Sequence, residues 1–142
     1  MNFFEAVSST YSKYFQSSGR SPRSEYWYFF LFMLIVDTCL MTFREIGVLA
    51  TGIVGLATFV PFTMLLIRRF HDIGWSGWWA SYPLVGFVVT RVIPDLLPDD
   101  HPFLTFVLFL GLGMIIFFFY LMCKKGNEGE NRFGPDPLDH KT

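Results

Sequence analysis

Four apolar segments separated by short polar stretches dominate the chain. They cover residues 26–43, 46–67, 78–93 and 103–123. A helix needs roughly 20 apolar residues to cross the hydrocarbon core of a bilayer. The first, second and fourth segments meet this need, and the third does so only with tilt or in a thinned bilayer. The pattern predicts four transmembrane helices, with one connecting loop at 68–77 and another at 94–102.

The distribution of basic residues predicts the orientation of these helices. Two of the basic residues, Arg44 and Arg91, lie toward the end of the helices that carries the 94–102 loop. The others all fall at the opposite ends of the segments: Lys13, Arg20, Arg23, Arg68, Arg69, Lys124, Lys125, Arg132 and Lys141. Lys and Arg are enriched in cytoplasmic loops. We therefore expect the 68–77 loop, the tail at 124–142 and both termini to be cytoplasmic, and the 94–102 loop to lie outside.

The segment ahead of the first apolar run, residues 1–19, has a helical pattern of its own. Phe4, Val7, Tyr11 and Tyr14 recur at the spacing of one helix face. Such a pattern is typical of an amphipathic helix lying on the inner leaflet, and a short helix packed on the bundle fits it equally well. The predicted fold class is an all-α integral membrane protein. It is a four-span helical bundle with an N-terminal amphipathic interfacial helix, forming a single membrane domain over 1–142.

Composition supports a membrane protein and excludes other classes. Apolar residues make up 52% of the chain and charged residues only 16%, against about 25% charged residues in soluble domains. The net charge of -1 argues against a nucleic-acid partner. The residues that most often bind metals lie in separate parts of the predicted topology; they are His71, His101, His140, Cys39 and Cys123. The sequence therefore predicts no metal site and no cofactor.

Three polar segments together resemble a known family. They read GRSPRSEYWYF at 19–29, RRFHDIGWSGWW at 68–79 and KKGNEGENRFGPDP at 124–137. In this order they resemble the bacterial inner-membrane family called domain of unknown function 805, over nearly the whole chain. The resemblance implies a small multi-span inner-membrane protein and implies no activity. All three segments lie on the predicted cytoplasmic side, so we expect them to converge on one polar surface rimmed by aromatic residues.

The paired arginines of the central segment have two interpretations. Arg68 and Arg69 end an apolar run, where arginines orient a helix by reaching toward the anionic leaflet. Together with Arg20 and Arg23 they also suit a bidentate site for phosphate or carboxylate. Both interpretations hold together if the anion is a lipid headgroup.

The neighbouring His71 and Asp72 suggest a catalytic dyad, but adjacent helical residues diverge by about 100°. Each therefore needs a partner elsewhere, and we favour a structural latch over acid–base chemistry. The candidate partners of His71 are Glu128 and Glu130. The candidate partners of Asp72 are Arg20, Arg23 and Arg132. We also expect the turn-rich tail to dock under the bundle, with Phe133 as an apolar anchor and Arg132 as a pairing charge.

Residues 74–77 read GWSG, the Gly-x-Ser-Gly of rhomboid intramembrane proteases. That chemistry needs a histidine from another span near the serine, and no predicted span contains one. Ser76 as the N-cap of the third helix explains the same letters.

Two charges, Asp37 and Arg91, fall inside predicted spans, where ionisable residues are costly and often functional. Their depths agree within one helical turn, so we predict a pair between the first and third spans. A protonated Asp37 facing a cavity and an Arg91 reaching outward are the alternatives.

The leading functional hypothesis is a non-enzymatic membrane protein that binds anionic lipid headgroups or a partner, which could be another membrane protein or a second copy. The predicted binding residues are Arg20, Arg23, Arg68, Arg69, His71, Asp72, Trp78, Trp79 and Arg132. One alternative is a small transporter or channel component with Asp37 and Arg91 in the path. Another is an enzyme on lipid-linked substrates that uses His71, Asp72 or Ser76.

Overall fold

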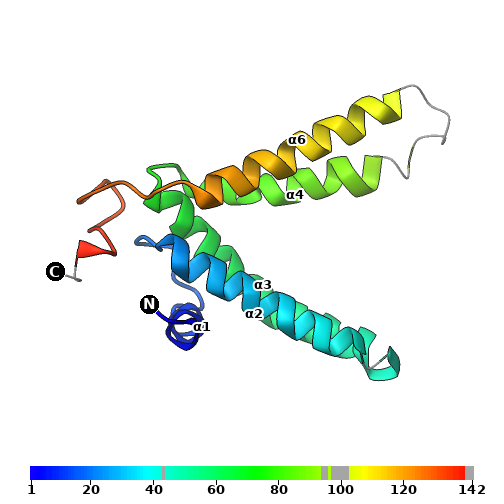
Figure 1. Ribbon diagram of the computed structural model, residues 1–142, viewed down its shortest axis with the longest axis horizontal. Helices are drawn as coiled ribbons and strands as arrows, with labels where there is room; N and C mark the ends of the chain where they lie inside the picture. The colour runs from blue at the N-terminus through cyan, green and yellow to red at the C-terminus, as the bar shows by residue number, and fades with distance from the viewer. Residues whose placement is uncertain (43, 94–95, 97–102, 140–142) are drawn as a thin grey trace. The chain divides into compact units, whose positions relative to one another are not determined.

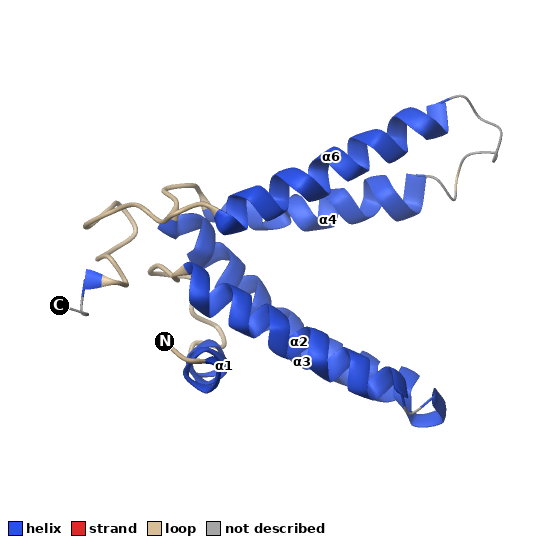
Figure 2. Ribbon diagram, viewed as in Figure 1, coloured by secondary structure: helices blue, strands red, loops and turns tan. Residues whose placement is uncertain are grey.

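The computed structural model describes residues 1–42, 44–93, 96 and 103–139, and of residues 41, 44–48, 51 and 91 it describes the backbone alone. These residues are mostly helical, and apart from one isolated bridge they form no strand, which confirms the all-α class (Figures 1 and 2). The elements are α1 (Phe3–Ser12), α2 (Arg23–Thr42), α3 (Arg44–Asp72), the 3₁₀ helix η1 (Gly77–Ser81), α4 (Tyr82–Phe87), the π-helix η2 (Val88–Val92) and α6 (Phe103–Cys123).

The chain divides into two compact units. The first unit is Met1–Gly77 together with Lys125–Thr142, and the second is Trp78–Lys124. The C-terminal tail therefore returns to the unit that contains the N-terminus.

In the first unit, α2 and α3 run side by side as a helical hairpin (Figure 1). Aromatic rings fill the contact: the Phe62 ring lies 6.1 Å from Tyr26 and 6.4 Å from Phe29, between ring centroids. Tyr26 and Phe29 are almost fully buried, as are Leu65 and Phe70 of α3. Close van der Waals packing of such side chains is what joins two apolar helices.

Helix α1 packs crosswise on this hairpin (Figure 1). It begins with a capping box, in which the Asn2 side chain accepts from the Glu5 amide and the Glu5 carboxylate accepts from the Asn2 amide. Its most buried residues are small, Ala6 and Thr10, both 0% exposed, and the Tyr11 ring beside them lies 5.6 Å from that of Phe29 of α2, while Phe4 is 81% exposed. The packing on the bundle, one of the two interpretations of this segment, is thus observed. Its placement on a membrane surface stays a prediction.

Helix α3 continues further than its hydropathy predicts. Residues 68–72, expected at the start of a loop, form its last turn. The helix persists because Arg69 and Asp72, three residues apart, pair across this turn. Gly74, two residues after the end of α3, stops the helix: its φ of 80° lies in the left-handed region that favours glycine. Its N–H donates to the His71 carbonyl at 3.0 Å. The connecting loop is correspondingly shorter than the predicted 68–77.

The second unit pairs α4 and η2 with α6. The segment 78–93, expected as one continuous helix, is divided into a 3₁₀, an α and a π part. Pro83 lies in the first turn of α4, where a missing N–H leaves no hydrogen bond unmade. The Tyr82 ring contacts α6, at 6.0 Å from Phe117 and 6.4 Å from Phe118. Of the predicted outer loop at 94–102, Leu96 alone lies within the described residues.

Within the described residues, two helical stretches are long and apolar enough to cross a membrane. They are Gly52–Asp72 of α3 and Phe103–Cys123 of α6. The count of four spans stays a prediction.

Candidate functional site

Charged and polar side chains are buried where the beginning of α2 meets the end of α3. We call this group the junction; its members are Arg20, Ser21, Glu25, Arg68, Arg69 and Asp72, each at most 7% exposed. Charged side chains are almost never fully buried unless they are paired. The partners of these groups therefore decide what the junction does.

Asp72 is the acceptor at the centre of the junction. Arg20 approaches its Oδ1 with Nε at 3.1 Å and Nη2 at 3.0 Å. Arg69 donates to Oδ2 from Nη1 at 2.7 Å. Arg20 is among the partners predicted for Asp72, and this pairing is confirmed. The second partner, Arg69, comes from the helix that continues through the expected loop.

Arg20 also holds the C-terminal tail. Its Nη1 donates to the carbonyls of Gly129 at 2.5 Å and Gly134 at 3.4 Å, and its Nη2 donates to that of Asn127. The Asn127 N–H in turn donates to the Asp72 carbonyl at 2.8 Å. One buried guanidinium thus satisfies three carbonyls between Asn127 and Gly134, and the predicted docking of the tail is confirmed.

His71 joins the same tail by stacking. Its ring lies 3.9 Å from that of Phe133, with only 4° between the planes, and the Arg132 guanidinium lies 4.6 Å from the Phe133 centroid. Its Nδ1 lies 3.1 Å from the Gly19 carbonyl, which can only accept, so Nδ1 carries the proton. The predicted partners of His71 are wrong: among the described contacts neither Glu128 nor Glu130 reaches it, and Glu128 pairs with Lys125.

The tail keeps its shape through local contacts as well. Asn131 and Gly134 exchange backbone hydrogen bonds at 3.1 and 2.9 Å, and the Asn131 side chain donates to the His71 carbonyl at 3.0 Å. Asp136 accepts from the Leu138 and Gly129 amides at 2.9 and 3.1 Å. These donors, that of Leu138 foremost, lower the pKa of Asp136.

Arg68 connects the hairpin to the segment after α1. Its Nε donates to Ser21 Oγ at 3.0 Å, and its Nη1 donates to the carbonyls of Gln16 and, at 3.4 Å, Lys13. Its Nη2 lies 4.0 Å from Glu25 Oε1. That oxygen also accepts from Ser9 Oγ at 2.9 Å and lies 3.8 Å from Lys13 Nζ.

Ser21 and Glu25 were not predicted as members of the site, and neither were the tail carbonyls of Asn127 and Gly129. Glu25 offered a signal, because it is an acidic residue directly ahead of an apolar run and close in sequence to Arg20 and Arg23. Backbone carbonyls carry no such signal, since every residue has one.

The structure therefore unites three segments that are distant in sequence, as predicted, but turns the three arginines of the junction inward. The Arg20, Arg68 and Arg69 guanidiniums are engaged within the chain. Arg23 and Arg132 are the exposed basic members of the predicted binding set. Trp78 and Trp79 begin the second unit, where they are 85% and 43% exposed.

Other candidate chemistry has less support from the geometry. Among the described residues no hydrogen bond joins Ser76 to His71, and no group of three or more His, Cys, Asp or Glu side chains is placed to hold a metal ion. The predicted pair of Asp37 and Arg91 depends on an Arg91 side chain that lies outside the described residues. It stays a prediction.

Comparison with known proteins agrees with the three polar segments. Residues 14–135 match the model of a family described as "Protein of unknown function (DUF805)". The chain belongs to this family. It is 32% identical over 128 residues to inner membrane protein YhaH of Escherichia coli K12, with 84% of each chain covered. It is 34% identical over 133 residues to inner membrane protein YhaI of the same strain, covering 91% of this chain and 92% of the relative. No solved structure matches.

Proposed function

We propose that this chain is a non-enzymatic, multi-pass inner-membrane protein whose C-terminal tail, held in a fixed fold by the junction, is a cytoplasmic binding surface for a protein partner. The observation that carries the proposal is the buried Arg20 guanidinium, which holds Asp72 and three tail carbonyls together. A tail that served only as a solvated end would need no such support.

Several observations support the membrane topology. Both relatives are named inner membrane proteins. The tail and α1 meet the hairpin at the same end, as two termini on one side of a membrane would (Figure 1). The basic residues gather at that end too, as in cytoplasmic segments. Helix α1 lies crosswise to the hairpin, with Phe4 on it 81% exposed and Phe15, three residues after it, 80% exposed. This arrangement suits a helix lying on the inner leaflet.

The charge of the tail favours a protein over a lipid headgroup as its partner. An anionic leaflet attracts clusters of Lys and Arg, but the tail at 124–142 carries as many acidic as basic residues and so has no net charge. The acidic residues are Glu128, Glu130, Asp136 and Asp139, and the basic ones are Lys124, Lys125, Arg132 and Lys141. Mixed charges beside the half-exposed Leu138 make the rim and apolar centre that protein interfaces use.

The test places a photo-crosslinking amino acid at Glu130, an exposed tail position, in cells that carry either the native chain or Arg20→Met. We expect a discrete protein adduct with the native chain, strongly reduced in Arg20→Met and retained in the control variant Lys13→Met, since the Lys13 ammonium lies 3.8 Å from Glu25 of the hairpin. Adducts that are the same in all three chains, or adducts to lipid alone, would overturn the proposal. Labelling of a single tail cysteine in inside-out but not in right-side-out vesicles is the result expected from the topology.

A further inference from the structure

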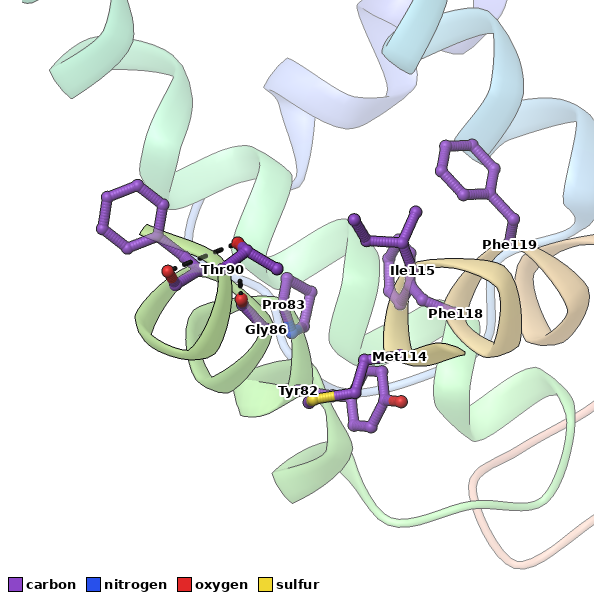
Figure 3. A pocket seen from close by; sticks show the side chains of 9 residues that line it. Tyr82, Pro83, Gly86, Thr90, Met114, Ile115, Phe118 and Phe119 are labelled. Atoms are coloured by element: carbon purple, nitrogen blue, oxygen red, sulfur yellow. Dashed lines mark hydrogen bonds between the residues drawn. The ribbon is translucent and has the colours of Figure 1, made fainter. Parts of the chain in front are cut away.

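The second unit carries a feature that the tail does not explain. Two adjoining apolar hollows, of about 190 and 310 Å³, lie along α4 and α6 and share Tyr82 and Met114 in their walls. Figure 3 shows that the side chains around the first of them come from both sides, Tyr82, Pro83 and Thr90 from one and Met114 and Phe118 from the other. The second hollow extends the first toward Trp78 and Trp79. Together they form one groove.

Glycines shape both the floor and the end of this groove. A Cβ at Gly86, which lines it, would meet nothing within 4 Å. The groove is therefore open where a side chain would otherwise fill it. A Cβ at Gly111 would lie only 2.3 Å from Thr90 Cγ2. The two helices thus close on each other at the level of Thr90.

The groove has one polar end and one apolar end. No lining residue is charged, and the Thr90 hydroxyl donates to the Gly86 carbonyl at 2.8 Å, so Thr90 has its hydrogen bond within the helix. Trp78, Trp79 and Tyr82 line the other end. The Tyr82 ring lies 6.0 Å from Phe117, in the last two turns of α6, and Lys124 follows this helix. Trp and Tyr with a nearby Lys mark the headgroup level of a bilayer.

The length of the groove fits one leaflet. From Trp79 to Thr90 the chain advances by roughly 16 Å at helical rise. The hydrocarbon core is about 30 Å thick, so one acyl chain occupies about half of that depth. An apolar seat of leaflet length, with a polar, basic end at headgroup level, has the order of groups found in a phospholipid.

We propose that this groove binds one acyl chain of an anionic phospholipid, with its headgroup at the Trp78–Trp79 end beside Lys124. The site rests on the membrane location proposed above and is independent of the tail and its partner. A second copy of the chain would cover the groove with apolar side chains but would not explain the basic, aromatic end.

Gly86→Leu tests the site, because the leucine side chain fills the groove without meeting a neighbour at Cβ. Gly113→Leu is its matched control: it lies on α6 of the same unit, its Cβ also meets nothing within 4 Å, and it does not line the groove. Leucine is a better helix former than glycine, so neither change weakens the helices. The full chain in detergent is titrated with long-chain phosphatidylglycerol, and native mass spectra measure the bound fraction and hence the affinity.

We expect Gly86→Leu to weaken the tightest phosphatidylglycerol site at least about tenfold, since excluding two or more methylenes removes that much binding energy. Gly113→Leu should bind as the native chain does, and Gly86→Ala should lie between the two. Dihexanoyl phosphatidylglycerol, which has the same headgroup and short chains, should bind weakly and should not distinguish the variants.

Equal affinities in all the chains would overturn the site. Equal losses of affinity for the long-chain and short-chain lipids in Gly86→Leu would assign the binding to the headgroup and would also overturn the acyl-chain site. A native dimer that Gly86→Leu disperses would make a second copy of the chain the occupant of the groove. Loss of the groove alone would leave the Glu130 adducts intact. A failed tail proposal would abolish the dependence of those adducts on Arg20 and leave lipid binding unchanged.

Discussion

Each of the two units of this protein has its own kind of internal contact. In the first, buried charges join segments that lie about a hundred residues apart, as from Arg20 to Gly129. In the second, apolar side chains join α4 to α6, and a close contact of Gly111 with Thr90 joins η2 to α6. Charge-assisted hydrogen bonds demand one geometry, whereas apolar contact tolerates many. The polar end of the first unit is therefore suited to holding one shape, whereas the apolar contact of the second leaves more freedom.

Removing Asp72 should have the largest effect on this contrast. Asp72→Ala leaves Arg20 and Arg69 buried without their carboxylate, and breaking such a buried pair costs about 3–5 kcal/mol. We expect a loss of that size in the free energy of unfolding of the first unit, measured by denaturation in detergent with a fluorophore on the tail. Glu130→Ala, at an exposed carboxylate of the tail, is the control. A loss under 1 kcal/mol for Asp72→Ala would show that the junction does not hold the unit.

Arg20→Met should release the tail, and it should lower the stability of the hairpin less than Asp72→Ala does. Asp72 keeps Arg69 as a partner, while the carbonyls of Asn127 and Gly129 lose their donor. Hydrogen bonds to charged groups are worth about 1.5–3 kcal/mol each. We expect trypsin to cut after Lys125 much faster in membranes of the variant than in native membranes. Lys13→Met, which removes a cation paired with Glu25 of the hairpin, should be cut after Lys125 at the native rate, and equal rates in all three would rule out a docked tail.

Gly111→Ala tests the second unit, where no buried charge is involved. The added Cβ would lie 2.3 Å from the Thr90 methyl, and Thr is stiff at χ1. Overpacking costs about 1–3 kcal/mol, and we expect the lower part of that range because only one methyl is added. Gly113→Ala, which meets open space, should instead stabilise α6 slightly through helix propensity.

Thr90→Ser should rescue Gly111→Ala, because it removes the clashing methyl and keeps the hydroxyl that bonds to Gly86. Thermal unfolding of the two single variants and the double variant would measure this coupling. If the double variant is less stable than Gly111→Ala alone, η2 and α6 do not meet at these residues.

The parts of this architecture that a sequence can predict are those with a periodic or compositional signal. Apolar segments predicted the α-helices, and the similarity of three polar segments predicted their convergence. The inward turn of Arg68 had no such signal, because a pair of arginines after an apolar run has the same pattern whether they face the leaflet or a buried acceptor. The end of α3 was misplaced because hydropathy falls at Arg68, while the helix persists through the pairing of Arg69 with Asp72.

The partner of His71 was missed for a different reason. Charge complementarity favoured a tail carboxylate, yet the tail presents the Phe133 ring to the imidazole and the Gly19 carbonyl takes the Nδ1 proton. A tail whose register is set by backbone carbonyls around Arg20 places its side chains by geometry rather than by charge. Side-chain charge alone could not predict that register.

Phe133→Leu is the smallest of the expected effects and the sharpest test of that register. The stacked His71–Phe133 pair, with Arg132 over the same phenyl ring, is worth about 0.5–1.5 kcal/mol beyond the area it buries. Leucine keeps most of that area and removes the stacking, so tail protection from trypsin should fall severalfold while unfolding of the hairpin is unchanged. Phe133→Tyr keeps the ring and should stay at the native level. Equal cleavage of the Leu and Tyr variants would mean that Arg20 alone holds the tail in place.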